Sequence, residues 1–183
     1  GNGTVHEDHV SGIMAGAGNL DPRVQGMGVG AELFAKDYEA TFLDETMMLF
    51  FENNILVTNS SFFNGCNDGY TSTAVTVDDQ IYDNPTLLHV FSCGNSSSND
   101  CNYGAGAIWG TITGGHKQGK NAIATASVNA IGVLAGSSSR GPAHDGRIKP
   151  DIAANGANVN STGADNDYFL SSGTSMAAPG IAG

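Results

Sequence analysis

Apolar positions follow two different spacings along the chain, and the two alternate. Three segments carry apolar residues at helical spacing and predict amphipathic helices: 9–17, 42–53 and 75–82. Four shorter runs rich in β-branched or small apolar residues predict buried strands: 54–59, 87–92, 122–126 and 151–154. We expect a further short strand at residues 32–37. This alternation predicts an α/β layer fold with a mostly parallel sheet in a single domain, residues 1–183.

Two polar segments interrupt this pattern. Residues 64–73 and 96–119 are rich in Gly, Ser and Asn, which is typical of loops. The second is long, and long loops in compact domains usually carry function. Gly makes up 26 of the 183 residues, about twice its average use, and so indicates many tight turns and close backbone contacts.

The charge balance excludes two classes of partner. The chain has 18 acidic and 7 basic residues, a formal net charge of -11. Such a field repels the phosphates of nucleic acids and anionic membrane surfaces, so we expect neither as a partner. No apolar run is long enough to span a bilayer.

The cysteines favour an oxidising environment. Cys66 and Cys101 lie in polar, Gly-rich segments, whereas Cys93 ends an apolar run. We expect a Cys66–Cys101 disulfide, a buried Cys93 and an extracellular, secreted protein. The alternative is three free thiols in a cytosolic protein. No zinc-binding spacing is present, and we assign no metal site.

Ser175 lies in the most distinctive motif of the chain. It follows Gly173-Thr174 and precedes small helix formers up to Pro179. A hydroxyl at a helix N-terminus sits where backbone N–H groups favour developing negative charge, although an N-cap Ser is the simpler alternative. Residues 173–179 resemble the nucleophile motif of the subtilisin-like serine peptidases (subtilases). The motif ends at Gly180, where that family usually has His.

A second stretch near the start of the chain resembles the His motif of the same family. Residues 6–12 read His-Glu-Asp-His-Val-Ser-Gly, against the usual His-Gly-Thr-His-Val-Ala-Gly. The resemblance implies that His6 is the general base and His9 is structural. A neutral imidazole can take a proton from Ser at neutral pH. Metal binding or a surface cluster is the alternative, and Glu7 and Asp8 depart from the family pattern.

Three further stretches resemble the binding and flanking segments of subtilases. Residues 91–96 are similar to the oxyanion segment and imply that Asn95 donates to the tetrahedral intermediate, although Gly-Asn is also a common turn pair. Residues 58–62 are similar to the strand that lines the primary specificity pocket, with Phe62 as a departure. Residues 138–151 are similar to a motif of many extracellular bacterial subtilases. The resemblance implies a substrate lying beside these residues: Ser60, Ser61, Ser92, Cys93 and Gly94.

The resemblance implies a subtilisin-like three-layer fold that is truncated at both ends. The family's triad Asp normally lies tens of residues upstream of the His, and only five residues precede His6. Asp8 matches no motif that would let it replace this carboxylate. We therefore expect the Asp outside these 183 residues. An isolated fragment of this kind should be inactive or unstable.

The sequence thus favours a secreted serine endopeptidase that hydrolyses protein or peptide substrates through an acyl-enzyme. We expect a monomer that requires no cofactor; structural calcium is compatible with the family, but no loop is assigned to it. One alternative is a catalytically inactive subtilase-like domain used for peptide binding or adhesion. A third reading, a small acidic cation-binding module, rests only on polar loops such as 99–100 and 165–167.

Overall fold

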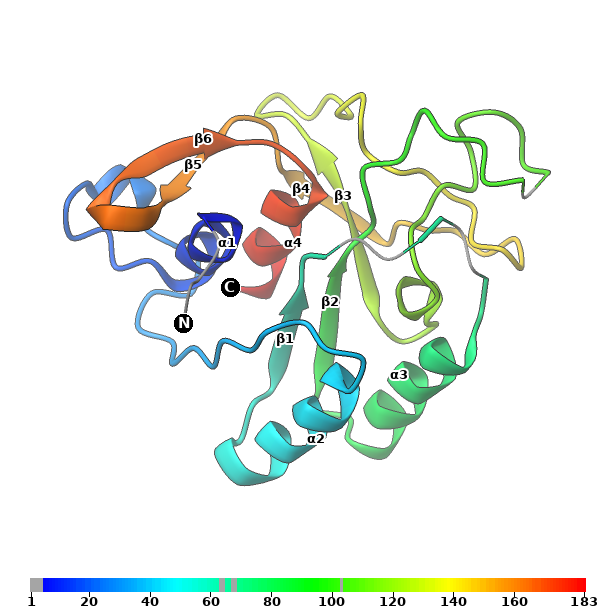
Figure 1. Ribbon diagram of the computed structural model, residues 1–183, viewed down its shortest axis with the longest axis horizontal. Helices are drawn as coiled ribbons and strands as arrows, with labels where there is room; N and C mark the ends of the chain where they lie inside the picture. The colour runs from blue at the N-terminus through cyan, green and yellow to red at the C-terminus, as the bar shows by residue number, and fades with distance from the viewer. Residues whose placement is uncertain (1–4, 63–64, 67–68, 103) are drawn as a thin grey trace.

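The fold is built on a parallel sheet of four strands in the order β1-β2-β3-β4 (Figure 1). The computed structural model describes residues 5–62, 65–66, 69–102 and 104–183. The strands are these: β1 Val57–Ser60, β2 Leu88–Ser92, β3 Ile123–Val128 and β4 Ile152–Asn155. Because all strands point the same way, the segments that follow β1 and β2 emerge at the same edge of the sheet.

Helices cover both faces of this sheet. Helices α2 (Phe42–Asn53) and α3 (Ser72–Asp83) lie on one side, and α4 (Thr174–Ala182) lies on the other, against all four strands (Figure 1). Helix α1 (Val5–Ala15) packs on α4. This arrangement confirms the predicted α/β class with a mostly parallel sheet, and it brings the two ends of the described chain together.

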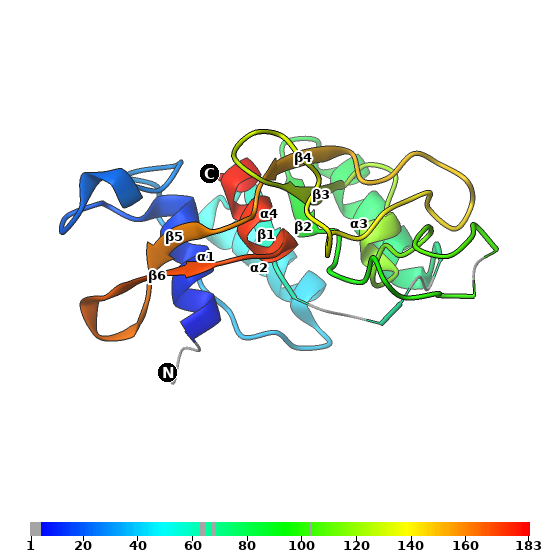
Figure 2. The same cartoon turned by 90° about the horizontal axis from the view of Figure 1, so that it is seen from above.

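An antiparallel hairpin, which the sequence pattern did not predict, joins the sheet to α4. Its strands are β5 (Val159–Thr162) and β6 (Tyr168–Ser171). Strand β5 packs against α1, and β6 runs directly into α4 (Figure 2). Three short 3₁₀ helices complete the elements of the described ranges: η1 (Pro22–Val24), η2 (His116–Gln118) and η3 (Ala164–Asn166).

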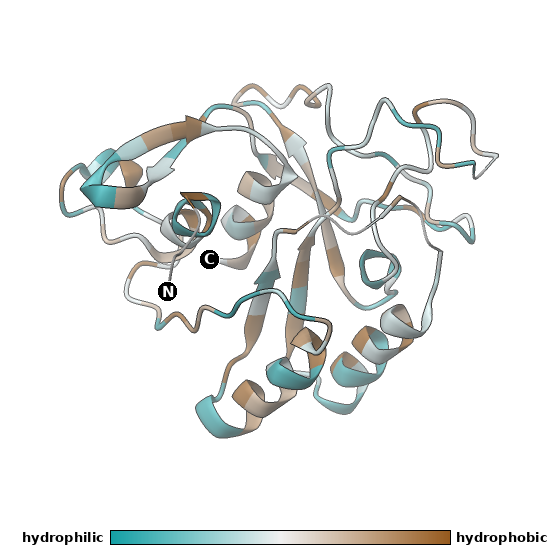
Figure 3. Cartoon of the chain, in the orientation of Figure 1, coloured by the Kyte–Doolittle hydropathy of each residue, from teal (hydrophilic) through white to brown (hydrophobic). Residues whose placement is uncertain are grey.

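The hydrophobic pattern explains which strands lie in the interior. The middle residues of β2 and β3 are buried, whereas the first residue of each strand is only partly buried. Figure 3 shows hydrophobic segments in these strands and hydrophilic segments on α2 and α3. Leu43, Val77 and Phe91 join α2, α3 and the sheet in one apolar cluster. The near-continuous apolar run of β2 therefore reflects cover by helices on both faces.

The strand predicted at residues 32–37 is wrong, because these residues form no strand in the structure. A strand needs a hydrogen-bonded neighbour, and a cavity lies between residues 32–38 and β1. The other predicted strands and helices are present with boundaries shifted by a few residues. Within the described ranges, none of the helices has the length and apolar character needed to cross a bilayer.

Candidate active site

Ser175 is the second residue of α4, and Gly173 makes the turn that places it there. Gly173 has φ 153°, a backbone conformation that favours glycine. A Cβ atom at this position would lie 3.1 Å from the side-chain nitrogen of Asn95. The Gly-Thr-Ser motif is thus a tight entry into a helix, and it places the serine in the first turn of that helix.

The Ser175 hydroxyl contacts the end of the first strand. Its Oγ donates to the carbonyl of Ser61 at 3.3 Å, and Ser61 Oγ donates to the carbonyl of Ser175 at 3.1 Å. Asn59 Nδ2 in turn donates to Ser61 Oγ at 3.0 Å. Ser175 is only half-buried, so its hydroxyl can exchange this long bond for another partner.

Asn95 lies beside the same helix start, on the segment that leaves β2. Its Oδ1 accepts from the backbone N–H of Thr174 at 2.9 Å and from Thr174 Oγ1 at 3.2 Å. Thr174 Oγ1 also accepts from the N–H of Gly94 at 3.1 Å. Because an N–H can bond only to the oxygen of the amide, these contacts fix which way the carboxamide faces. The Nδ2 group is left as a donor on the exposed side, close to Gly173.

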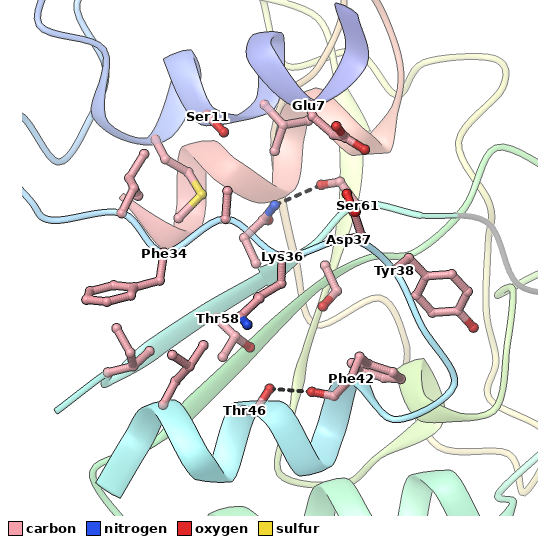
Figure 4. Close-up of a pocket in the computed structure, with 18 of the residues that line it drawn as sticks. Glu7, Ser11, Phe34, Lys36, Asp37, Tyr38, Phe42, Thr46, Thr58 and Ser61 are labelled. Carbon is pink, nitrogen blue, oxygen red and sulfur yellow. Dashed lines mark hydrogen bonds between the residues drawn. The ribbon is translucent and has the colours of Figure 1, made fainter. Parts of the chain in front are cut away.

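His6 lies in the first turn of α1 and is exposed. It lines a cavity of about 300 Å³ together with Ser60 and Ser61. Figure 4 shows Glu7 and Ser11 of α1 on one side of this cavity and Ser61 across from them. His6 and the Ser61 partner of Ser175 therefore face the same space, although among the described residues no hydrogen bond joins His6 to Ser175.

His9 has a different setting, three residues further along α1. Its Nε2 lies 3.1 Å from the carbonyl of Val159 and 3.0 Å from that of Phe169, so this nitrogen carries the proton. The ring also packs on Phe169, with centroids 4.5 Å apart. Burial lowers the pKa of His9, although the two backbone hydrogen bonds oppose this effect. The contacts make His9 an anchor between α1 and the β5–β6 hairpin.

The residues expected along the substrate fall into two groups. Ser60 and Ser61 line the cavity beside His6. In contrast, Ser92, Cys93 and Gly94 are buried. Burial raises the pKa of the Cys93 thiol to about 11, so the group is neutral. The backbone N–H and carbonyl groups of Cys93 and Gly94 are also hydrogen-bonded within the protein, so the structure does not open this second segment to the cavity.

The two long loops are joined by a disulfide between Cys66 and Cys101, whose Cα atoms are 5.7 Å apart. Cys93 is free. The carbonyl of Cys66 also accepts from the N–H of Gly114 at 3.0 Å. The bridge therefore ties the loop that follows β1 to the loop that follows Asn95.

The described residues contain no group of three or more His, Cys, Asp or Glu side chains that could hold a metal ion. Sequence reasoning also missed a residue that orients the site. Thr174 donates to Asn95 and accepts from the N–H of Gly94, yet the motif contains it only as the neighbour of Ser175. Only its hydrogen bonds to the segment after β2 reveal that Thr174 orients the site.

Comparison with protein families gives a match along almost the whole chain. Residues 2–183 match the model of the subtilase family. A C5a peptidase of Streptococcus pyogenes is 56% identical over 46 residues. That match covers 25% of this chain and 4% of the streptococcal protein, so the chain spans only a small part of that relative's length.

Solved structures share the fold. The CspB protease of Clostridium perfringens superposes with a TM-score of 0.76 at 15% identity, over 97% of this chain and 68% of CspB. The PatG macrocyclase in complex with peptide has a TM-score of 0.74 at 16% identity, and the match covers 97% of this chain and 50% of PatG. The psychrophilic protease S41 has a TM-score of 0.66 at 24% identity, and the match covers 97% of this chain and 60% of S41.

Proposed function

Because the chain belongs to the subtilase family, we propose that it forms the part of a serine endopeptidase that carries the nucleophile, the general base and an oxyanion donor. Ser175 is the nucleophile, His6 the base and Asn95 the donor. The observation that supports this most is the pair of bonds from Thr174 to Asn95 Oδ1, which turns the amide of Asn95 toward the start of α4.

The reaction follows from the chemistry of these groups. His6 takes the proton of the Ser175 hydroxyl as its Oγ attacks the carbonyl carbon of the peptide bond. Asn95 Nδ2 and the backbone N–H of Ser175 donate to the negative oxygen of the tetrahedral intermediate. His6 then returns the proton to the leaving amine. Water hydrolyses the acyl-enzyme by the same steps in reverse order.

The third triad member in this proposal is an Asp outside the 183 residues. Strand β1 is an edge of the sheet, and its exposed residue Val57 lines the cavity. Segment 32–38 lines the same cavity (Figure 4). His6 is also among the residues that line it. A further strand in this space would pair with β1 and could present a carboxylate to His6.

The substrate class and setting belong to the same proposal. The substrate is a protein or peptide that lies extended beside the segments ending at Ser61 and Gly94. The disulfide supports secretion, since such bonds persist in oxidising compartments. We propose a monomeric enzyme that needs no cofactor.

Two observations favour a second candidate, a catalytically inactive domain that binds peptides. Among the described residues no hydrogen bond joins His6 to Ser175. In addition, Glu7-Asp8 stands where the family usually has Gly-Thr. Such hydrogen bonds are often long in unliganded enzymes, so the peptidase is the stronger proposal.

Labelling with a fluorophosphonate separates the two candidates in the full-length protein. The peptidase account predicts stoichiometric labelling that is lost in Ser175→Ala and strongly slowed in His6→Ala. Ser172→Ala is a matched control, because Ser172 is an exposed serine before the same helix. An unlabelled but folded wild-type protein would instead support the peptide-binding domain.

A further inference from the structure

Lys117 is a buried cation that the proposed mechanism does not use. It lies in η2, and its side chain has no exposed surface. Its Nζ donates to the carbonyl of Phe62 at 2.8 Å and to Thr113 Oγ1 at 2.9 Å. None of the carboxylates in the described ranges forms an ion pair with it.

A buried ammonium without an anion is costly, because two hydrogen bonds to neutral acceptors replace only part of the hydration that it loses. Burial lowers the pKa of Lys117 to about 8, which leaves it mostly protonated at neutral pH. The neighbouring Cys93 thiol is neutral there and offers no full counter-charge. Among the described residues, two neutral acceptors and the Phe62 ring, whose centroid is 5.9 Å from Nζ, surround the charge, so its retention points to a role other than stability.

The two acceptors of Lys117 belong to the two segments that border the candidate active site. Phe62 directly follows Ser61, which exchanges hydrogen bonds with Ser175. Thr113 donates to the carbonyl of Cys93 from its N–H at 3.0 Å and from its Oγ1 at 3.3 Å. The ammonium therefore links the segment after β1 to the segment that leads to Asn95.

We propose that Lys117 is a positioning residue that sets the spacing between these two segments, and with it the channel that accepts an extended peptide. The inference rests on the proposed peptidase function. A peptide bound between the segments would depend on that spacing along its length. A small reagent that reacts only at Ser175 would depend on it far less.

A purely structural lysine would behave differently when it is replaced. Loss of a structural contact lowers stability, whereas removal of an unpaired buried charge also removes the cost of its lost hydration and offsets that loss. Lys117→Met keeps most of the length of the side chain and removes the charge. Lys120→Met is the control, since Lys120 is exposed and lies only three residues further along.

The test uses the full-length protein and compares peptide hydrolysis, fluorophosphonate labelling and thermal unfolding. For Lys117→Met we expect kcat/KM on peptides to fall about 10- to 100-fold, mainly through KM. The labelling rate should stay within about twofold of the wild type, because the reagent makes no use of the channel. The Tm should be unchanged or higher. Lys120→Met should match the wild type in all three.

The possible results distinguish a failure of the proposed peptidase function from a failure of the positioning role of Lys117. A wild-type protein that is not labelled contradicts the proposed function itself. Two results with Lys117→Met overturn the positioning role alone. One is normal labelling with an unchanged KM. The other is a parallel fall in labelling rate, kcat/KM and Tm. If Lys117→Met does not fold, Thr113→Val decides, because it keeps the shape of the side chain and removes both hydroxyl bonds of the link, the one from Lys117 and the one to Cys93. It should raise KM in the same direction, and an unchanged KM overturns the inference.

Discussion

At the scale of single residues, the oxygen and the nitrogen of the Asn95 carboxamide have separate tasks. The oxygen holds the start of α4 through Thr174, and the nitrogen is the proposed donor to the oxyanion. One substitution can separate the two tasks, because an Asp side chain keeps the acceptor and loses the donor.

Asn95→Asp should therefore preserve the fold and impair the chemistry. Loss of an oxyanion donor typically lowers kcat by about 10²- to 10³-fold, and the added negative charge opposes the oxyanion further. Steady-state kinetics of the full-length protein measure this, with Asn99→Asp as a control of equal charge in the same loop. A normal kcat in Asn95→Asp would remove Asn95 from the mechanism.

The buried histidines predict how stability depends on pH. Burial lowers the pKa of His89 to about 4 and that of His116 to about 3, from 6.5. Their contribution to stability is complete above pH 6.5 and is lost as the pH falls toward these values. Each should lower the free energy of unfolding by about 1.4 kcal/mol per pH unit within that window.

His116→Leu should remove the share of His116 in this slope between pH 6.5 and 5. That share is about 1.4 kcal/mol per pH unit, which corresponds to one bound proton. Both ring nitrogens of His116 lack a hydrogen-bond partner within the described structure, and Phe62 and Phe91 pack on the ring. The variant should therefore also be no less stable than the wild type at pH 7. Urea unfolding at several pH values measures both effects, and identical slopes would contradict this account of His116.

The sequence identified candidate residues by their motifs but could not show their surroundings. His6 and His9 stand in one motif, and the structure exposes the first and buries the second against two carbonyls. The partner of His9 lies 160 positions away, at Phe169. Lys117 lies in no motif, since its role depends on contacts between segments that are distant in the sequence.

At the scale of elements, periodicity predicted the helices and strands that have one buried face. Helix α2 occupies the predicted residues 42–53. The pattern failed where an element depends on a neighbour. Residues 32–37 have strand-like residues without a pairing partner, and the strands of the β5–β6 hairpin have only four residues each. Its stability comes from packing on α1, which local pattern does not show.

The entry into α4 gives a prediction with an internal control. Gly173→Ala introduces strain at φ 153° and a side chain against Asn95, so it should destabilise the protein by about 1–3 kcal/mol and slow labelling of Ser175. Gly180→Ala lies within the same helix with open space around it, and it should stabilise by about 0.5–1 kcal/mol. Equal effects of the two substitutions on labelling and stability would contradict the proposed geometry of this turn.

At the scale of the whole molecule, helices from opposite ends of the chain meet on one face of the sheet. Helix α1 carries His6 and helix α4 carries Ser175, and the two pack together (Figure 1). The Cys66–Cys101 disulfide joins two loops that follow neighbouring strands. The order of the motifs along the sequence suggested this convergence, but only packing on the common sheet brings the elements together.

The disulfide should stabilise the whole fold. It closes a loop of 35 residues, for which the chain-entropy model gives about 3–4 kcal/mol. The double variant Cys66→Ser/Cys101→Ser should lose about that free energy of unfolding, and reducing agent should then have no further effect. Denaturant unfolding with and without reductant measures this, and a double variant as stable as the wild type would contradict it.

The most direct test of the central claim is a crystal structure of the full-length protein after reaction with a fluorophosphonate. The account predicts a covalent bond to Ser175 Oγ, a phosphonyl oxygen about 2.7–3.1 Å from Asn95 Nδ2, and the His6 imidazole beside the same adduct. An adduct on another residue, or a labelled Ser175 with His6 and Asn95 turned away from it, would contradict the account.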